Sequence, residues 1–274
     1  MSTAPTSFFT LPAELRNQIY GLVWSRNDNI PSAAPERSPL AEALLLDTHR
    51  SGKAKSEPQY GAHMALLLVC RQIRTEADLL ALSRTTFHLT GKSVLPDAFH
   101  SQISTLSTCQ IKSIRKLTLT ARVTHLRAMN EAWEGLPFGH PCLHLDRLVI
   151  VPQKPDTSGS CYAEVADLSQ CHTLAYVLAE TLKSLRRVTC VEVQNHGCFN
   201  GLVWRLLYRC LVYRMWRWGG IACGLKFAAS DAGDDDSGKE WFKVMIGDEH
   251  EGHEVGAEVC RLMGKEGMDP GLFS

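Results

Sequence analysis

The chain has 274 residues, 45% of them hydrophobic, and its 29 basic residues are balanced by 29 acidic ones. This length and apolar content are enough for one or two domains with sizeable cores. Because the net charge is zero, no overall field attracts nucleic acid or an acidic membrane, and we expect neither partner.

Targeting signals and metal-binding patterns are missing from the sequence. The N-terminus has neither the basic lead nor the apolar run of a signal peptide, and no stretch of about 18 apolar residues occurs. No two of the ten cysteines have the two-residue spacing of structural zinc. Cys70, Cys190 and Cys210 lie in apolar patterns, where a thiol packs as a small hydrophobe. We therefore expect a soluble protein of the cytoplasm or nucleus, with reduced thiols, no metal and no cofactor.

The first predicted helix spans residues 8–24. Pro12 suits a first helical turn, where its missing N–H costs nothing, and Glu14 lies close to the positive end of the helix dipole. The apolar residues recur at helical spacing and predict a buried face made of Leu11, Leu15, Ile19, Leu22 and Val23.

A second helix is predicted over residues 64–84. Its apolar residues follow three- and four-residue steps, which place one stripe on the helix: Leu66, Val69, Cys70, Ile73, Ala77 and Leu80. The charged residues fall outside this stripe, so the helix is amphipathic. We expect the two helices to bury each other within a region that covers residues 1–90.

These two segments resemble an F-box, and more closely a large, mostly fungal F-box-like family. The run Leu11-Pro12-Ala13-Glu14-Leu15 followed by Ile19 is similar to the opening of an F-box, and Leu68-Val69-Cys70-Arg71 is similar to its later helix. Thr86-Phe87 resembles the closing motif of the fungal family. The sequence departs from the family at residues 25–63, an insertion with four prolines where an F-box has a short connection.

The resemblance implies a protein-interaction module, not an enzyme. F-box proteins bind the Skp adaptor of a cullin-RING ubiquitin ligase and recruit a protein substrate, which the sequence does not identify here. The residues that match the adaptor-binding motif are Leu11, Pro12, Leu15, Ile19, Leu68, Val69 and Cys70. The alternative is a structural protein that has lost adaptor binding, in which the same residues only hold the two helices together. An adaptor-binding face would leave an exposed apolar patch of a few hundred Å², with Leu11 and Pro12 at its edge.

Residues 91–247 are predicted to form an α/β region. Strands are predicted at 85–90, 114–123, 145–151 and 188–193, with helices at 94–110, 126–133 and 166–187 between them. The strand centres lie about thirty residues apart, or somewhat more in the last step, which is typical of successive βα units. Two architectures satisfy this spacing: a short, irregular stack that resembles leucine-rich repeats, which we favour, and a mostly parallel closed sheet.

Residues 199–218 form a predicted helix that is rich in arginine and aromatic residues. Such a helix can contact RNA by stacking or lie on a membrane surface, which predicts exposed Trp204, Trp216 and Trp218 beside Arg205 and Arg209. We favour the alternative of a nearly buried helix that covers the sheet and keeps its arginines at the margin.

The end of the chain is predicted to be a hairpin and a tail. Residues 221–229 and 241–246 form its strands, residues 230–239 form a solvated acidic loop, and residues 248–274 form a polar, glycine-rich, frayed tail. His250 and His253 lie three residues apart in this tail, whereas a metalloprotease helix needs four, so we interpret them as solvated.

The sequence carries no phosphate-binding loop and no nucleophile elbow. His144 and Asp146 with Ser158 or Ser160 are residue types too common to predict a catalytic triad without geometry.

Overall fold

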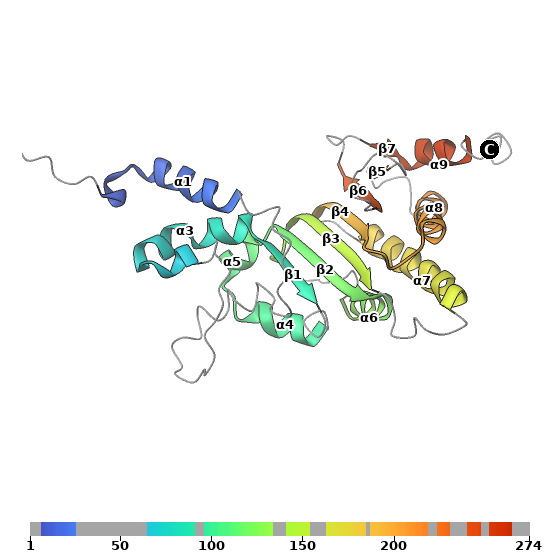
Figure 1. Cartoon of the computed structure of the whole chain (residues 1–274), viewed down its shortest axis with the longest axis horizontal. Coiled ribbons are helices and arrows are strands. Elements are labelled where there is room, and N and C mark those ends of the chain that lie inside the picture. The colour runs from blue at the N-terminus through green and yellow to red at the C-terminus, as the bar shows by residue number, and fades with distance from the viewer. Residues whose placement is uncertain are drawn as a thin grey trace, which may run out of the picture.

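One mixed sheet with a layer of helices forms the body of the molecule (Figure 1). The computed structural model describes residues 7–25, 65–90, 96–133, 141–153, 163–184, 187–218, 224–230, 240–247 and 252–264. The predicted α/β class is confirmed. Residues 26–63 of the predicted insertion and residues 231–239 of the predicted hairpin loop lie outside the described residues.

The described part of the sheet contains seven strands in the order β1, β2, β3, β4, β6, β5, β7. The first four strands are parallel, and each pairs with its predecessor in the chain. Strands β6, β5 and β7 extend the sheet in antiparallel fashion. The strands are β1 Thr86–Thr90, β2 Lys116–Arg122, β3 Leu145–Gln153, β4 Val188–Asn195, β5 Leu225–Ala229, β6 Glu240–Ile246 and β7 His253–Glu254. The predicted strands and hairpin are therefore present, and β1 to β4 follow one another as an open series of βα units.

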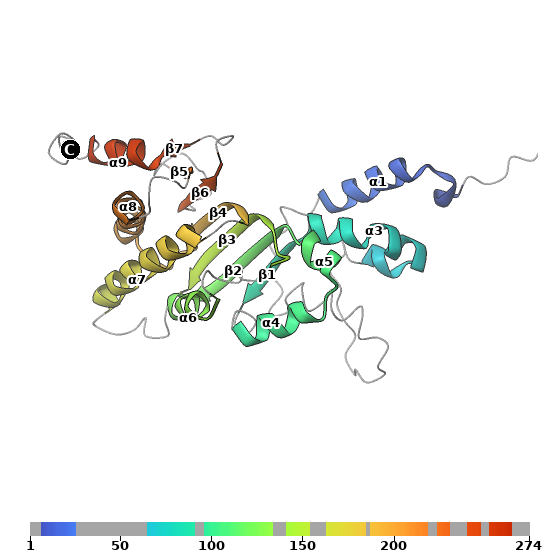
Figure 2. The ribbon, with the colours of Figure 1, turned by 180° about the vertical axis from the view of Figure 1, so that it is seen from behind.

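The helices of the body lie mainly on one side of the sheet (Figures 1 and 2). Right-handed crossovers that all step in the same direction place their helices on the same face. Accordingly, α4 contacts α6, α6 contacts α7, and α7 contacts α8, in chain order. The helices are α4 Pro96–Ser104, α5 Thr108–Ser113, α6 Val123–Trp133, α7 Ala163–Ser184, α8 Gly201–Trp218 and α9 Val255–Gly264.

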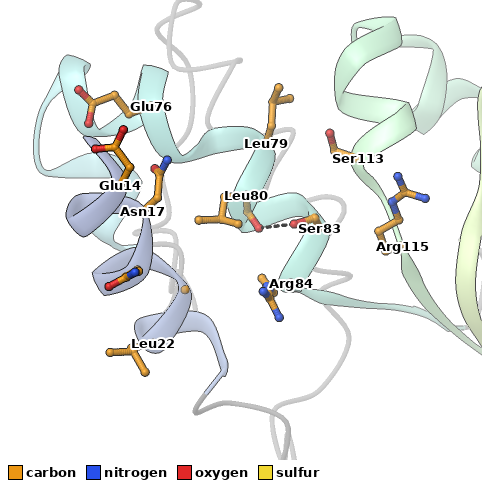
Figure 3. Close-up of a pocket in the computed structure, with 12 residues that line it drawn as sticks. Glu14, Asn17, Leu22, Glu76, Leu79, Leu80, Ser83, Arg84, Ser113 and Arg115 are labelled. Carbon is orange, nitrogen blue, oxygen red and sulfur yellow. Dashed lines mark hydrogen bonds between the residues drawn. The ribbon is translucent and has the colours of Figure 1, made fainter. Parts of the chain in front are cut away.

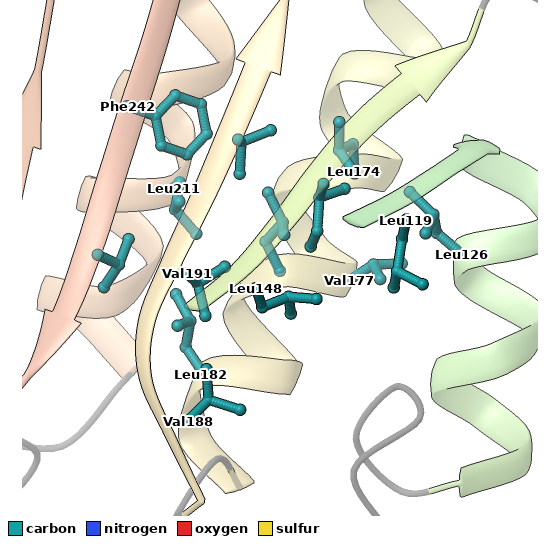
Figure 4. Packing of buried hydrophobic residues seen from close by; sticks show 14 of the residues in the cluster. Leu119, Leu126, Leu148, Leu174, Val177, Leu182, Val188, Val191, Leu211 and Phe242 are labelled. Atoms are coloured by element: carbon teal, nitrogen blue, oxygen red, sulfur yellow. The ribbon is translucent and has the colours of Figure 1, made fainter. Parts of the chain in front are cut away.

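The core lies between this helical layer and the sheet. Phe87, Leu117, Leu148, Val191 and Val244 are aligned across five neighbouring strands, and each is buried. Figure 4 shows how side chains from α6, α7 and α8 pack against the apolar side chains of these strands. Burial of such a side chain stabilises the fold by about 1.5–3 kcal/mol.

The predicted helix over 64–84 is interrupted. A 3₁₀ helix, η2 Ala65–Leu68, is followed by α3 Arg71–Arg84. Cys70 stands between them in an extended conformation, and its Sγ accepts the backbone N–H of Ile73 at 3.4 Å. The thiol therefore caps α3, a role that is usually filled by Ser, Thr, Asp or Asn. The interruption breaks the predicted stripe, because Val69 is exposed while Leu67 is buried.

The predicted buried face of the first helix is wrong. A 3₁₀ turn, η1 Phe8–Thr10, precedes α1 Ala13–Ser25. Tyr20 and Trp24 are the residues of α1 that are buried, together with Leu67, Ile73, Ala77 and Ala81 from the second segment. Leu15, Ile19, Leu22 and Val23, which we expected inside, are exposed. The aromatic side chains bury more area per residue than the aliphatic ones and occupy the contact with α3.

The predicted helix over 94–110 is divided into α4 and α5. The Ser107 backbone N–H donates to Gln110 Oε1 at 2.9 Å, and the Gln110 N–H donates to Ser107 Oγ at 3.3 Å. This reciprocal pair is a capping box, and it starts a second helix within the apolar pattern that had predicted a single helix.

The predicted frayed tail is also wrong for the residues that the structure describes there. Residues 252–264 form β7 and α9, and α9 packs on α8 and β5. Glu258 is fully buried, where Tyr208 Oη donates to its Oε1 at 2.7 Å and Arg261 Nε donates to its Oε2 at 2.7 Å. Because these hydrogen bonds offset the cost of burying the carboxylate, the polar composition of this segment did not prevent folding.

Candidate functional site

The N-terminal elements η1, α1, η2 and α3 form a small unit, the head, which contacts the rest of the molecule through α3 and α5. Arg16 of α1 reaches Glu76 of α3 with two hydrogen bonds, from Nε at 2.9 Å and from Nη2 at 2.8 Å. Tyr20 Oη also donates to Glu76, at 3.3 Å, and Gln72 Nε2 donates at 3.0 Å. One carboxylate therefore joins the two helices of the head.

The shifted pKa values of Glu76, Arg16 and Tyr20 fix the charges of these three side chains at neutral pH. Hydrogen bonds from Arg16 and Gln72 hold the pKa of Glu76 below its ordinary value of 4.5, and the same ion pair raises the pKa of Arg16. Burial raises the pKa of the Tyr20 phenol. Glu76 is thus ionised and accepts, while Arg16 and Tyr20 donate, so the contact serves to hold α1 in place.

α1 has a second apolar face that α3 does not cover. Leu15, Ile19, Leu22 and Val23 recur at three- and four-residue steps, beside the buried pair Tyr20 and Trp24. Leu22 is 70% exposed. A surface helix packs against the rest of its protein through one apolar stripe. Apolar residues around more of its circumference are typical of a helix that is buried on more than one side.

The seven residues that match the adaptor-binding motif all lie outside the buried core of the head. Leu11 and Cys70 are half-buried, and Pro12, Leu15, Ile19, Leu68 and Val69 are exposed. Val69 reaches 66% exposure because it stands in the break between η2 and α3. Five of the seven side chains are therefore accessible, whereas Cys70 packs against the buried cluster of the head.

An open groove of about 930 Å³ runs beside this surface, between α1, α3 and the start of β2 (Figure 3). Leu22, Leu79 and Leu80 provide its apolar part. Glu14, Asn17, Arg84 and Arg115 are among its polar residues. Grooves of this mixed character receive amphipathic helices in many protein complexes.

Sequence reasoning missed the residues that assemble the head, namely Arg16, Tyr20, Trp24 and Glu76. One signal was available, because Tyr20 and Trp24 lie one helical turn apart and follow Arg16 at the same four-residue interval. The sequence did not predict that Glu76 is the partner of Arg16, because the two residues are 60 positions apart in the chain.

The arginine-rich helix α8 is buried on its inner side. Trp204 is 4% exposed and packs on Phe242, with ring centroids 5.1 Å apart, whereas Trp216 and Trp218 are exposed. The favoured interpretation of a helix covering the sheet is therefore correct for its inner half. The RNA or membrane interpretation predicted that all three indoles are exposed, and the structure buries Trp204 but leaves Trp216 and Trp218 exposed.

Among the described residues, the face of the sheet opposite the core carries one buried charge, Glu192. Burial alone would raise its pKa, but hydrogen bonds from Gln194 at 2.5 Å and Arg147 at 2.7 Å outweigh burial and lower it. Lys243 Nζ lies 3.5 Å away. The carboxylate is therefore ionised and neutralised by its neighbours, as in a structural ion pair.

The residues considered for catalysis or metal binding are not assembled where the structure describes them. His144 Nδ1 lies 3.3 Å from the carbonyl of Cys142, and Asp146 pairs with Arg115 at 3.6 Å. Ser158, Ser160 and His250 lie outside the described residues, and His253 is exposed in β7. Within those residues, no three His, Cys, Asp or Glu side chains converge to bind a metal.

Comparison with known proteins leaves the family open. No protein-family model, no curated protein and no solved structure matches the chain. In the part of the chain that is described, no helix combines the length and apolarity needed to cross a bilayer.

Proposed function

We propose that the chain is a protein-interaction module whose head docks on an adaptor of the Skp type and whose α/β body presents a surface to a second protein. In this proposal it acts as a recruiting subunit of a cullin-RING ubiquitin ligase and performs no chemistry itself. The observation that carries the proposal is the exposure of apolar side chains on α1, at Leu15, Ile19 and Leu22, and at the break between η2 and α3, at Leu68 and Val69.

Docking would gain free energy by burying these side chains. Each aliphatic side chain that goes from exposed to fully buried contributes on the order of 1.5–3 kcal/mol, and part of that gain is already taken where a side chain is half-covered. A micromolar complex needs about 8 kcal/mol after the cost of association, so docking would have to bury all five of these side chains together with further contacts. The ion pair between Arg16 and Glu76 holds α1 in a fixed position on α3. Docking would therefore lose little conformational entropy from α1.

The test is direct binding of the purified full chain to a purified Skp-type adaptor, measured by isothermal titration calorimetry. The variant Leu15→Asp/Ile19→Asp should lose at least tenfold in affinity, because it places charge on the apolar face of α1. The matched control is Leu168→Asp/Leu202→Asp, which changes two exposed leucines on α7 and α8 and should leave the affinity unchanged.

Two results would overturn the proposal. The first is a folded wild-type chain that binds no adaptor. The second is an equal loss of affinity in both double variants, which would show that the α1 face is not the docking surface. Dimerisation of the wild-type chain through the same leucines, seen by sedimentation and abolished by Leu15→Asp/Ile19→Asp, would instead assign the face to a second copy.

A further inference from the structure

The groove between α1, α3 and the start of β2 carries opposite charges at its two ends (Figure 3). Glu14 in the first turn of α1 and Glu76 in α3 line one end. Arg84 in the last turn of α3 and Arg115 just before β2 line the other. Glu76 and Arg84 are separated by roughly 12 Å along the axis of α3, at 1.5 Å per residue. The groove is therefore acidic at one end and basic at the other.

One charge at each end has no ion-pair partner within the described residues. The Glu76 carboxylate is bound by the guanidinium of α1 at 2.8 Å, and Arg115 pairs with Asp146 at 3.6 Å. Glu14 and Arg84 are exposed, and in the described part of the chain neither side chain forms an ion pair or a hydrogen bond. Glu14 reaches the guanidinium of α1 only through longer-range attraction. One acid and one base are thus available to a ligand.

The middle of the groove is apolar and open. Leu79 is 45% exposed, and Leu80 is half-buried beside it. Gly21 lines the opposite wall, where a Cβ would meet no atom within 4 Å, so a partner can approach the backbone of α1 closely. An occupant gains free energy by placing an apolar stripe along this part of the groove.

Two of the walls are helices, and this selects the conformation of the occupant. The backbone N–H and C=O groups of α1 and α3 are used within the helices themselves, so these walls offer no ladder of hydrogen bonds to an extended segment. An occupant must therefore satisfy its own backbone groups, as a helix does. A helical stripe with apolar residues at i, i+4 and i+7 spans roughly 10.5 Å, which fits between the two charged ends.

We infer that the groove binds an amphipathic helix of another protein, with a basic side chain at one end of its apolar stripe and an acidic side chain at the other. The basic side chain pairs with Glu14, the acidic one pairs with Arg84, and the stripe covers Leu79 and Leu80. Such exposed ion pairs are individually weak. They select the partner, whereas the apolar stripe supplies most of the affinity.

This inference deepens the proposed function, because it gives the chemistry of the protein to be recruited, and it rests on the proposed function only for that role. Asn17 and Gly21 line the groove. At about 100° per residue, they lie on the side of α1 opposite to Leu15 and Ile19. An adaptor docked on Leu15 and Ile19 therefore approaches α1 from the other side, with Leu22 at the border of the two surfaces.

The test uses the full chain without adaptor and fluorescein-labelled fourteen-residue peptides with blocked ends, followed by fluorescence anisotropy. Every peptide has leucines at i, i+4 and i+7. The first has Lys at one end of this stripe and Glu at the other, the second has Lys at both ends, and the third has Glu at both ends. The first should bind at least fivefold more tightly than the others at 50 mM salt, and the preference should shrink at 300 mM. A central proline in the first peptide should weaken its binding at least tenfold, because it breaks the helix.

Single charge reversals should redirect this preference, with folding of each variant checked by circular dichroism. Glu14→Lys should favour the peptide with Glu at both ends, and Arg84→Glu should favour the peptide with Lys at both ends. Leu79→Asp should weaken the first peptide at least tenfold. The matched control is Leu168→Asp on α7, where the leucine is 42% exposed, and it should leave binding unchanged.

Four results would overturn the inference: absence of binding, equal binding of the three peptides, a preference that does not follow the charge reversals, and undiminished binding of the proline peptide. Self-association of the chain that Leu79→Asp abolishes would also overturn it, by assigning the groove to a second copy. Leu15→Asp/Ile19→Asp should leave peptide binding intact, which separates a failure here from a failure of adaptor docking.

Discussion

Arg16 in α1 and Glu76 in α3 are joined by two hydrogen bonds of 2.9 and 2.8 Å across 60 residues of sequence. Arg16 also donates from Nη1 to the carbonyl of Leu11 at 2.5 Å, which ties the start of α1 to the same guanidinium. A planar guanidinium that holds both oxygens of a carboxylate fixes orientation as well as distance. The position of α1 therefore depends on this pair.

Removal of either partner should release α1 from α3. We expect Arg16→Met and Glu76→Gln each to raise the hydrogen-exchange rate of the Tyr20 and Trp24 amides at least tenfold, while amides in β2 and β3 keep their protection. The double variant should lose less exchange protection than the sum of the losses in the two single variants, because both substitutions remove the same interaction.

The control pair is Arg127 and Glu131 on α6, which has the same 2.8 Å distance but is exposed and lies within one helix. Arg127→Met should leave exchange in the head unchanged. Unchanged exchange in both single variants of the Arg16 pair would show that apolar contacts alone hold α1.

The head should be acid-sensitive. Because the pKa of Glu76 is lower in the folded head than its ordinary 4.5, its ionisation contributes stability that is complete above pH 4.5. That contribution is lost as the pH falls from 4.5 through the lower, folded pKa. The wild type should therefore lose α1 protection in this window, and Glu76→Gln should lack this step. A Glu76→Gln profile parallel to that of the wild type would contradict the assignment.

Gly21 lies in the interior of α1, and a Cβ added there would meet no atom within 4 Å. Gly21→Ala should therefore raise the stability of the helix by about 0.8–1 kcal/mol, measured by urea unfolding. Gly197 is the matched control, since it also has open space but adopts φ +76°. Gly197→Ala should cost about 1–2 kcal/mol, because only glycine adopts that conformation without strain. The same sign at both positions would contradict this account.

Glu258 should be required for the docking of α9. Glu258→Ala removes the acceptor for Tyr208 and Arg261, and hydrogen bonds to a charged group contribute about 1.5–3 kcal/mol. We expect a loss of about 2 kcal/mol in thermal or urea unfolding. Glu254→Ala changes an exposed acid of β7 and should stay within about 0.5 kcal/mol. Equal effects would show that α9 adds little to the fold.

Cysteine reactivity should follow burial. Burial raises the pKa of the Cys171 thiol to about 12, and its Sγ lies 3.7 Å from the carbonyl of Val203. Since the thiolate is the reactive form, Cys171 should resist iodoacetamide at pH 8 in the native protein. Cys109 and Cys260 are exposed and should react first, as mapped by mass spectrometry. Early modification of Cys171 would show that the α7–α8 contact opens readily.

The parallel strands were predictable because each is alternating or continuously apolar over a short run. Leu117 and Leu119 in β2 illustrate this, since both are buried and lie on the same face. Leu117 is in register with Leu148 and Val191, and Leu119 is in register with Ile150 and Val193. The antiparallel placement of β6 beside β4 was not predictable, because no local pattern distinguishes the edge that a hairpin will join.

The head was harder to predict because α1 carries two apolar sets. Aliphatic spacing at Leu15, Ile19 and Leu22 is as regular as the aromatic spacing at Tyr20 and Trp24, and only tertiary contact decides which one is buried. The prediction of a frayed tail at the end of the chain failed for a different reason. Val255, Val259 and Leu262 follow helical steps, but the glycines and charges around them outweighed that signal.

Strands β1 to β4 are added in the same order in which they occur in the chain. Each unit therefore buries its apolar face on the unit made just before it, and folding can advance by local closure of short loops. During evolution such a body can gain or lose a whole βα unit without a change in the order of the remaining strands. The gain or loss would change the distance between the two ends of the sheet and leave the structure at each end intact.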